Sequence, residues 1–168
     1  MMMNEVSEAN TITSGLRLWL ADDDDLLRGL IAELLGRSEN VQCSRQFSSA
    51  EELLSTLQTE RPPDLILLDL NMTGMSGIEA IGPIKRLASG TRVFIMTTFY
   101  DSMAVSSARA AGASGFILKR DDWQEVIERL QDESADWAAA GSVAVPLPSE
   151  IPGPEVWSRA FRRSYVEA

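Results

Sequence analysis

Five short apolar runs alternate with segments of helical periodicity between about Leu16 and Glu133. The runs lie at 16–21, 41–45, 65–68, 93–96 and 115–118. Strands that alternate with helices in this way are typical of a parallel sheet whose crossover helices cover both faces. The sequence therefore predicts an α/β fold built on a doubly wound, five-stranded parallel sheet.

Charge and composition exclude several classes of function. The chain of 168 residues has 25 acidic and 15 basic side chains, a net charge of −10, and no histidine. Histidine-dependent catalytic triads and histidine-ligated zinc are therefore excluded, and the single Cys43 cannot form an intramolecular disulfide. An acidic surface repels phosphate backbones, so no direct DNA binding is predicted. No apolar run approaches the ~20 residues of a membrane span, and we expect a cytoplasmic protein.

The two ends of the chain differ from its middle. Residues 1–15 show no hydrophobic period and are predicted to form a flexible arm, whereas residues 16–133 form the domain. Residues 134–168 are predicted to be a Pro-rich linker and a short amphipathic helix. The aromatic face of this helix is expected to pack on its own domain, on a second copy of the chain or on another protein. A homodimer is therefore one of the predicted arrangements. Too few residues follow Glu133 for a winged-helix or helix-turn-helix domain, which favours a stand-alone domain.

Polar side chains stand where four of the five predicted strands end. The first strand runs into Asp22–Asp25, the third ends at Asp69, the fourth at Thr97 and the fifth at Lys119. Ligands of an open parallel sheet bind at this edge, so these groups are expected to converge. Carboxylates this close repel one another unless a hard cation lies among them, which predicts Mg²⁺. Cation, ammonium and hydroxyl together suit phosphoryl transfer to a carboxylate.

The order of an acidic pair, Asp, Thr and Lys at successive strand ends resembles the CheY-like receiver domain of response regulators in two-component signalling. The strings that carry the resemblance are LADDDDLLR, PDLILLDLNMTGMSG, VFIMTT and GASGFILK. The resemblance covers about 16–133 and implies a flavodoxin-like strand order of 2-1-3-4-5.

The resemblance also implies a metal site and a phosphoacceptor. Asp69 would accept the phosphoryl group. Mg²⁺ would be held by Asp22, Asp23, Asp69 and the backbone carbonyl of Asn71.

Three further residues would report the phosphorylated state. The resemblance implies that Thr97 and Lys119 contact the phosphoryl oxygens, and that Thr97 and Phe116 change conformation together as a switch. A few charge-assisted hydrogen bonds from a phosphoryl group suffice to tip such a two-state element.

The implied partners are proteins. The phosphoryl donor would be a phosphohistidine of a sensor histidine kinase or phosphorelay protein, and an unknown target would bind the face formed by the fourth helix, fifth strand and fifth helix. The domain would act on its own Asp69 only, by self-phosphorylation and autodephosphorylation, and is otherwise not an enzyme.

Four positions depart from the usual pattern of the family. Thr73 replaces a proline, which predicts a less constrained loop after the third strand. Thr98 replaces a smaller side chain and is expected to hinder access to the site. Arg120 replaces a proline, so the cis peptide bond common there is expected to be absent. Phe116 keeps the packing of the usual tyrosine without its hydroxyl.

Other interpretations stay open. Asp24 and Asp25 are expected to serve as a helix start, because Asp favours helix N-termini. Asp69, Asn71 and Thr73 echo the nucleophile motif of haloacid-dehalogenase-like phosphatases, although Asn71 stands where that family has its second aspartate. A receiver-like scaffold that works without phosphate is the third alternative.

Overall fold

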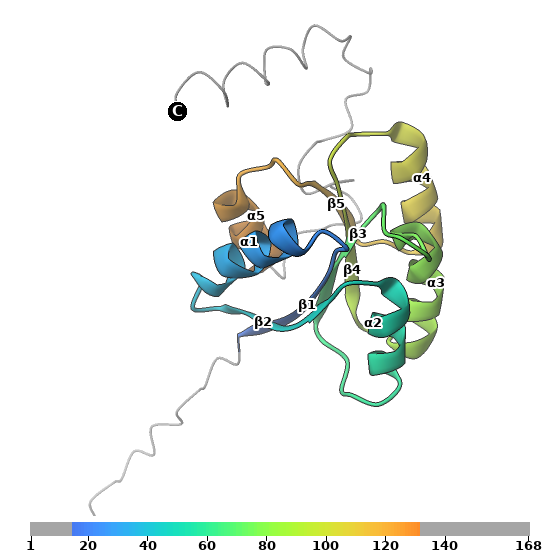
Figure 1. Ribbon diagram of the computed structural model, residues 1–168, viewed down its shortest axis with the longest axis horizontal. Coiled ribbons are helices and arrows are strands. Elements are labelled where there is room, and N and C mark those ends of the chain that lie inside the picture. The colour runs from blue at the N-terminus through green and yellow to red at the C-terminus, as the bar shows by residue number, and fades with distance from the viewer. Residues whose placement is uncertain (1–14, 132–168) are drawn as a thin grey trace, which may run out of the picture.

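The computed structural model describes residues 15–131, in which strands and helices alternate strictly (Figure 1). Its elements are β1 Leu16–Ala21, α1 Asp25–Gly36, β2 Val41–Phe47, α2 Ala50–Leu57, β3 Leu65–Asp69, α3 Gly77–Leu87, β4 Arg92–Thr97, α4 Ser102–Ala111, β5 Gly115–Leu118 and α5 Trp123–Gln131. The predicted alternation of five strands with five helices is confirmed.

All neighbouring strands pair in parallel, in the order β2-β1-β3-β4-β5. This order confirms the flavodoxin-like topology. The strand β3 occupies the centre, and all five of its residues are buried. Its apolar run lacks alternation because the sheet is covered on both faces.

Two hydrophobic clusters lie on opposite faces of the sheet. Leu65 and Leu67 pack toward α1 and α5, whereas Ile66 and Leu68 pack toward α2, α3 and α4 (Figure 1). Each such side chain contributes about 1.5–3 kcal/mol by leaving water. This double burial fixes the strand register, and with it the position of Asp69 at the end of β3.

Gly82 and Pro83 both disfavour a helical backbone, which predicts a kink or a break in the third helix. This helix, α3, is not broken in the structure. It is continuous over Gly77–Leu87, with Pro83 inside it. Pro83 withholds the hydrogen bond that the carbonyl of Glu79 would accept, but Glu79 is exposed and that carbonyl can bind water. The buried residues Ala80, Ile81 and Ile84 span the proline and hold both halves of the helix against the core.

The spacing of Ser49 and Glu52 predicts a capping box at the start of α2, of which only one half forms. Ser49 caps α2 by accepting the N–H of Glu52, as predicted. The carboxylate of Glu52 instead accepts the N–H of Ser48 at 3.3 Å. A complete box forms at α3, where Ser76 and Glu79 bond each other's backbone N–H.

The predicted arm of residues 1–15, apart from Gly15, lies outside the described residues, as do the linker and short helix of 134–168. Across 15–131, no helix combines the length and the apolar character that crossing a membrane requires. All peptide bonds in this range are trans, including the one after Lys119, which agrees with the expectation from Arg120.

Candidate functional site

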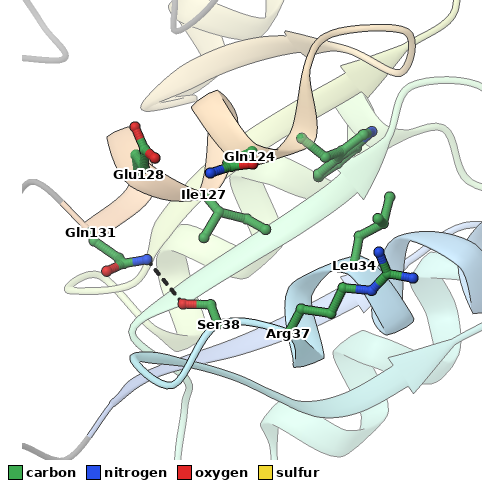
Figure 2. Close-up of a pocket in the computed structure, with 8 residues that line it drawn as sticks. Leu34, Arg37, Ser38, Gln124, Ile127, Glu128 and Gln131 are labelled. Carbon is green, nitrogen blue, oxygen red and sulfur yellow. Dashed lines mark hydrogen bonds between the residues drawn. The ribbon is translucent and has the colours of Figure 1, made fainter.

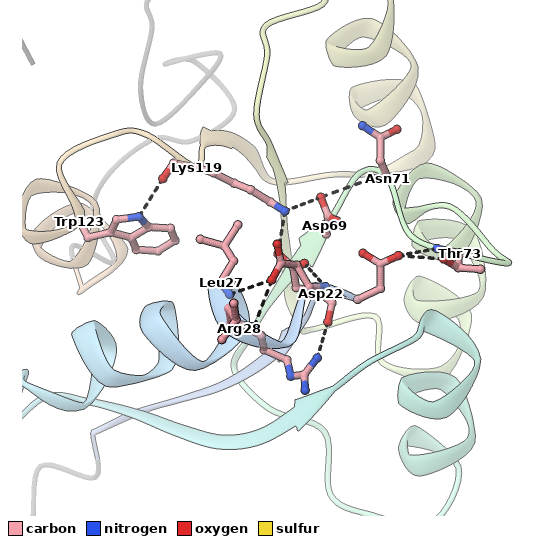
Figure 3. Close-up of polar contacts among 11 residues, drawn as sticks. Asp22, Leu27, Arg28, Asp69, Asn71, Thr73, Lys119 and Trp123 are labelled. Atoms are coloured by element: carbon pink, nitrogen blue, oxygen red, sulfur yellow. Dashed lines mark hydrogen bonds and ion pairs between the residues drawn. The ribbon is translucent and has the colours of Figure 1, made fainter. Parts of the chain in front are cut away.

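The carboxyl ends of β1, β3 and β5 bring three charged side chains together. The Nζ atom of Lys119 lies 2.7 Å from Oδ2 of Asp22 and 3.1 Å from Oδ1 of Asp69 (Figure 3). All three side chains are at most 10% exposed. A buried ammonium therefore balances two buried carboxylates at the edge of the sheet where ligands of this fold bind.

The turn from β1 to α1 divides the four consecutive aspartates between two tasks. Asp24 caps α1 by accepting the N–H groups of Leu26 and Leu27, and Asp25 pairs with Arg28. Asp22 points inward, where its Oδ1 accepts the N–H of Asp24 at 2.9 Å. The expectation that Asp24 and Asp25 start the helix is confirmed.

Asp22, Asp23 and Asp69 form a three-carboxylate cluster. One side-chain oxygen from each lies within 4.8 Å of the other two. Within the described residues the cluster is balanced by the ammonium of Lys119, which contacts Asp22 and Asp69. Three carboxylates that share one ammonium keep an excess of negative charge, which fits a hard divalent cation, and Mg²⁺ takes oxygen ligands of this kind.

Burial and charge set the pKa values in the pocket. Burial raises the pKa of Asp69 to about 6, a rise that Lys119 opposes and Asp22 reinforces. Burial disfavours the ammonium of Lys119, but its contacts with Asp22 and Asp69 outweigh this effect and raise its pKa. At neutral pH the pocket therefore holds a cationic Lys119 and an ionised Asp69, the form in which a carboxylate is a nucleophile.

The loop between β3 and α3, which the missing proline predicts to be less constrained, donates hydrogen bonds to two carboxylates, those of Asp23 and Glu51. The N–H and the hydroxyl of Thr73 both donate to Oδ2 of Asp23, at 2.9 and 3.0 Å (Figure 3). The N–H of Met75 donates to Oε1 of Glu51 on α2 at 2.8 Å. A proline at 73 would lack both donors, so the threonine replaces a stiff ring with a tether to the acidic cluster. The bond from the Thr73 N–H is the main reason that the pKa of Asp23 is lowered.

The remaining predicted residues lie at or near the pocket. Thr97 is buried at the end of β4, and its hydroxyl donates to the carbonyl of Phe99 at 3.2 Å. The backbone N–H of Asn71 lies 3.4 Å from Oδ1 of Asp69. Phe116 is buried in the core on the α2, α3 and α4 face. Thr98, expected to restrict access, is exposed.

Gly77 is a residue whose importance the sequence reasoning missed. A Cβ atom at this first position of α3 would collide with the backbone carbonyl of Asp69. The N–H of Gly77 donates to the carbonyl of Leu70 at 3.0 Å, which draws the helix start against the end of β3. The one local sequence signal of this packing is that Gly77 directly follows the capping Ser76.

A separate groove of about 380 Å³ lies between the end of α1 and α5 (Figure 2). Its lining includes Leu34 and Arg37 on one side and Trp123, Ile127 and Gln131 on the other. None of the predicted site residues lines it, so it is distinct from the acidic pocket.

Comparison with known proteins identifies the family of this fold. The family model described as the response regulator receiver domain matches residues 18–131, more than half of the chain. The chain belongs to this family. The receiver is 32% identical to the transcriptional regulatory protein LiaR of Bacillus subtilis over 119 residues, which are 71% of this chain and 56% of LiaR. It is 32% identical to a nitrate/nitrite response regulator homologue of Haemophilus influenzae over 117 residues, 69% and 55% of the two chains.

A solved structure supports the same assignment. The crystal structure of a LuxR-family two-component response regulator from Aurantimonas sp. SI85-9A1 aligns with a TM-score of 0.67 and 27% identity. The alignment covers 90% of this chain and 99% of that chain. The receiver chain spans little more than half the length of the two curated relatives.

Proposed function

We propose that this receiver is a phosphorylation switch, in which Asp69 accepts a phosphoryl group and thereby changes the protein's contacts with a partner. The observation that carries the proposal is the convergence of Asp69 with Lys119 and two further aspartates at the edge of the sheet.

The phosphoryl group would come from a phosphohistidine of a sensor histidine kinase or phosphorelay protein. A carboxylate oxygen of Asp69 attacks phosphorus, the P–N bond breaks, and the imidazole leaves with the bonding electron pair. Lys119 faces Asp69 and would pair with a phosphoryl oxygen. Water attack at the phosphorus of the acyl phosphate would release inorganic phosphate and return the free carboxylate, which is the slow autodephosphorylation expected of Asp69.

The cation of this site would be Mg²⁺, held by Asp22, Asp23, Asp69 and the backbone carbonyl of Asn71. When bound, it neutralises charge on the phosphoryl oxygens and relieves the repulsion among the three carboxylates. The residues fit this role because one oxygen from each of Asp22, Asp23 and Asp69 lies within 4.8 Å of the other two, and two of these carboxylates share the ammonium of Lys119.

The conformational change would begin at Thr97 and extend to the protein surface. Turning the hydroxyl of Thr97 toward a phosphoryl group on Asp69 requires release of its bond to Phe99, and Phe116 would repack with it. Phe99, in the loop between β4 and α4, and Met103, in the first turn of α4, are 69% and 78% exposed. This exposure supports the face of α4, β5 and α5 as the surface that a downstream protein reads.

The proposal concerns a cytoplasmic receiver that acts through protein contacts, and direct DNA binding by residues 16–133 is not part of it. The net charge of the chain, −10, disfavours a phosphate backbone. The names of relatives report transcriptional regulation for those proteins. The phosphorylation of Asp69 would be the same whether the receiver works alone or controls an attached output domain.

Intact mass after incubation with acetyl phosphate and Mg²⁺ tests the proposal. We expect the wild type to gain one phosphate and Asp69→Ala to gain none. Failure of the wild type to gain phosphate, with an unchanged α4 surface in beryllofluoride, would support the scaffold alternative instead. Turnover of a generic phosphomonoester would support the phosphatase alternative.

A further inference from the structure

We propose that Thr73 is a positioning residue for the metal ligand Asp23, which it holds through two hydrogen bonds to one carboxylate oxygen. The inference rests on the Mg²⁺ site of the proposed function. Both donors of Thr73 reach Oδ2 of Asp23, at 2.9 Å from the N–H and 3.0 Å from the hydroxyl. The other carboxylate oxygen is thereby the one left to bind a cation.

Asp23 needs such support more than the other two aspartates. Asp22 and Asp69 are buried and ion-paired with Lys119, whereas Asp23 is exposed. Like charges within this cluster repel Asp23, and its exposed side chain has room to turn into solvent. Two donors from Thr73 oppose that rotation and keep an oxygen of Asp23 close to the other carboxylates (Figure 3). Ligating carboxylates are commonly fixed in this way by an outer hydrogen-bonding partner.

The loop between β3 and α3 is held by a second hydrogen bond that does not involve Thr73. The effect of the Thr73–Asp23 contact can therefore be tested separately from the effect of loosening the loop. The N–H of Met75 donates to Glu51 on α2, and Gly74 lies between Thr73 and Met75 with φ of +85°. Glu51 is not one of the three clustered carboxylates. A substitution at Glu51 therefore loosens the loop without removing a donor from Asp23.

The test is isothermal titration of the full chain with Mg²⁺ in the absence of any phosphodonor. We expect Thr73→Val, which keeps the N–H and loses the hydroxyl, to bind Mg²⁺ about 10-fold more weakly than wild type. Thr73→Ser keeps both donors and should stay within about twofold of wild type. Glu51→Ala, which removes the acceptor of the Met75 N–H, should also stay within about twofold, because it leaves both bonds to Asp23 in place.

Several results would overturn the inference. These are wild-type protein that binds no Mg²⁺, Thr73→Val with unchanged or tighter affinity, or equal losses in Thr73→Val and Glu51→Ala. The urea midpoint of each variant shows whether it is folded. If Thr73→Val is not folded, Thr73→Ala, which also keeps the N–H and loses the hydroxyl, takes its place in the test.

The phosphate assay separates this inference from the proposed function. Weaker Mg²⁺ binding by Thr73→Val, combined with no phosphate on wild-type Asp69, supports the role of Thr73 and contradicts the phosphoacceptor. Phosphate on Asp69, combined with unchanged Mg²⁺ affinity in Thr73→Val, supports the phosphoacceptor and contradicts the role of Thr73.

Discussion

Lys119 and Asp22 form a 2.7 Å ion pair in which the carboxylate is fully buried and the lysine side chain is 10% exposed. The same ammonium also reaches Asp69 at 3.1 Å. Folding therefore gathers acidic groups that repel one another, and Lys119 is the cation that offsets their repulsion. The stability of the folded pocket therefore depends strongly on the side chain of Lys119.

Replacing Lys119 with methionine should destabilise the metal-free protein by about 3–5 kcal/mol at neutral pH, because two buried carboxylates lose their counter-ion. Millimolar Mg²⁺ should recover part of the loss by supplying positive charge to the same oxygens. Urea unfolding with Mg²⁺ and with EDTA measures both effects.

Lys85→Met is the matched control, because Lys85 is the other lysine of the chain and donates to the carbonyl of Thr91 at 2.6 Å. It should lose about 1 kcal/mol, without dependence on Mg²⁺. Equal losses in the two variants would contradict the special role of Lys119.

Asp69→Asn should stabilise the metal-free protein at neutral pH. Folding raises the pKa of Asp69 from 3.8 to about 6. Between these values the folded state holds a proton that the unfolded state has released, so the contribution of Asp69 to stability falls as pH rises through the window. Above pH 6 the full cost is present, about 3 kcal/mol at 1.36 kcal/mol per pKa unit.

The advantage of Asp69→Asn in EDTA should therefore shrink as pH falls from 6 to 3.8, and chemical denaturation at several pH values measures it. Asp101→Asn, at the exposed N-cap of α4, serves as the control, because asparagine caps helices as well as aspartate does. A gain for Asp69→Asn that stays constant with pH would contradict the burial argument.

The strand ends of the site could be predicted from the sequence because each polar residue follows an apolar run. Asp69 comes directly after the buried run Leu65–Leu68, and Lys119 directly after Leu118. The parallel topology then brings these ends to one edge of the sheet, so side chains remote in sequence meet without any further information. The fold and the core of the pocket follow from local pattern and a general rule of topology.

The contacts between loops could not be predicted in this way. Thr73 and Asp23 are separated by 50 residues, and their contact depends on the path of two loops that no periodicity describes. The missing proline at Thr73 was a correct observation, but the sequence does not show where the freed N–H donates. The continuity of α3 through Pro83 likewise depends on tertiary packing, which outweighs local propensity.

Gly77→Ala should destabilise the protein and displace Asp69. The added Cβ would collide with the backbone carbonyl of Asp69, so either α3 or the end of β3 must move. We expect a loss of about 1–3 kcal/mol, typical of an overpacked position, together with weaker Mg²⁺ binding. Thermal or urea unfolding and Mg²⁺ titration measure the two effects.

Gly82→Ala provides a control within the same helix, because a Cβ there meets only the end of the Arg86 side chain at 3.5 Å. Alanine in an open helical position should instead stabilise the protein by about 0.4–1 kcal/mol. Similar effects of the two substitutions would show that helix propensity, rather than the contact with Asp69, determines the outcome at Gly77.

Thr97→Val should uncouple the surface from the state of Asp69. In the structure the Thr97 hydroxyl donates to the Phe99 carbonyl at 3.2 Å, a bond that must break before the hydroxyl can reach a phosphoryl group. With beryllofluoride and Mg²⁺, we expect the amide resonances of residues 98–101 to shift in wild type and in Thr97→Ser, which keeps the hydroxyl. In Thr97→Val these shifts should be lost, although the adduct on Asp69 should still form. Nitrogen–proton correlation spectra compare the three proteins, and ¹⁹F resonances of bound beryllofluoride report the adduct. Shifts of wild-type size in Thr97→Val would show that the region around Phe99 responds to Asp69 by another route.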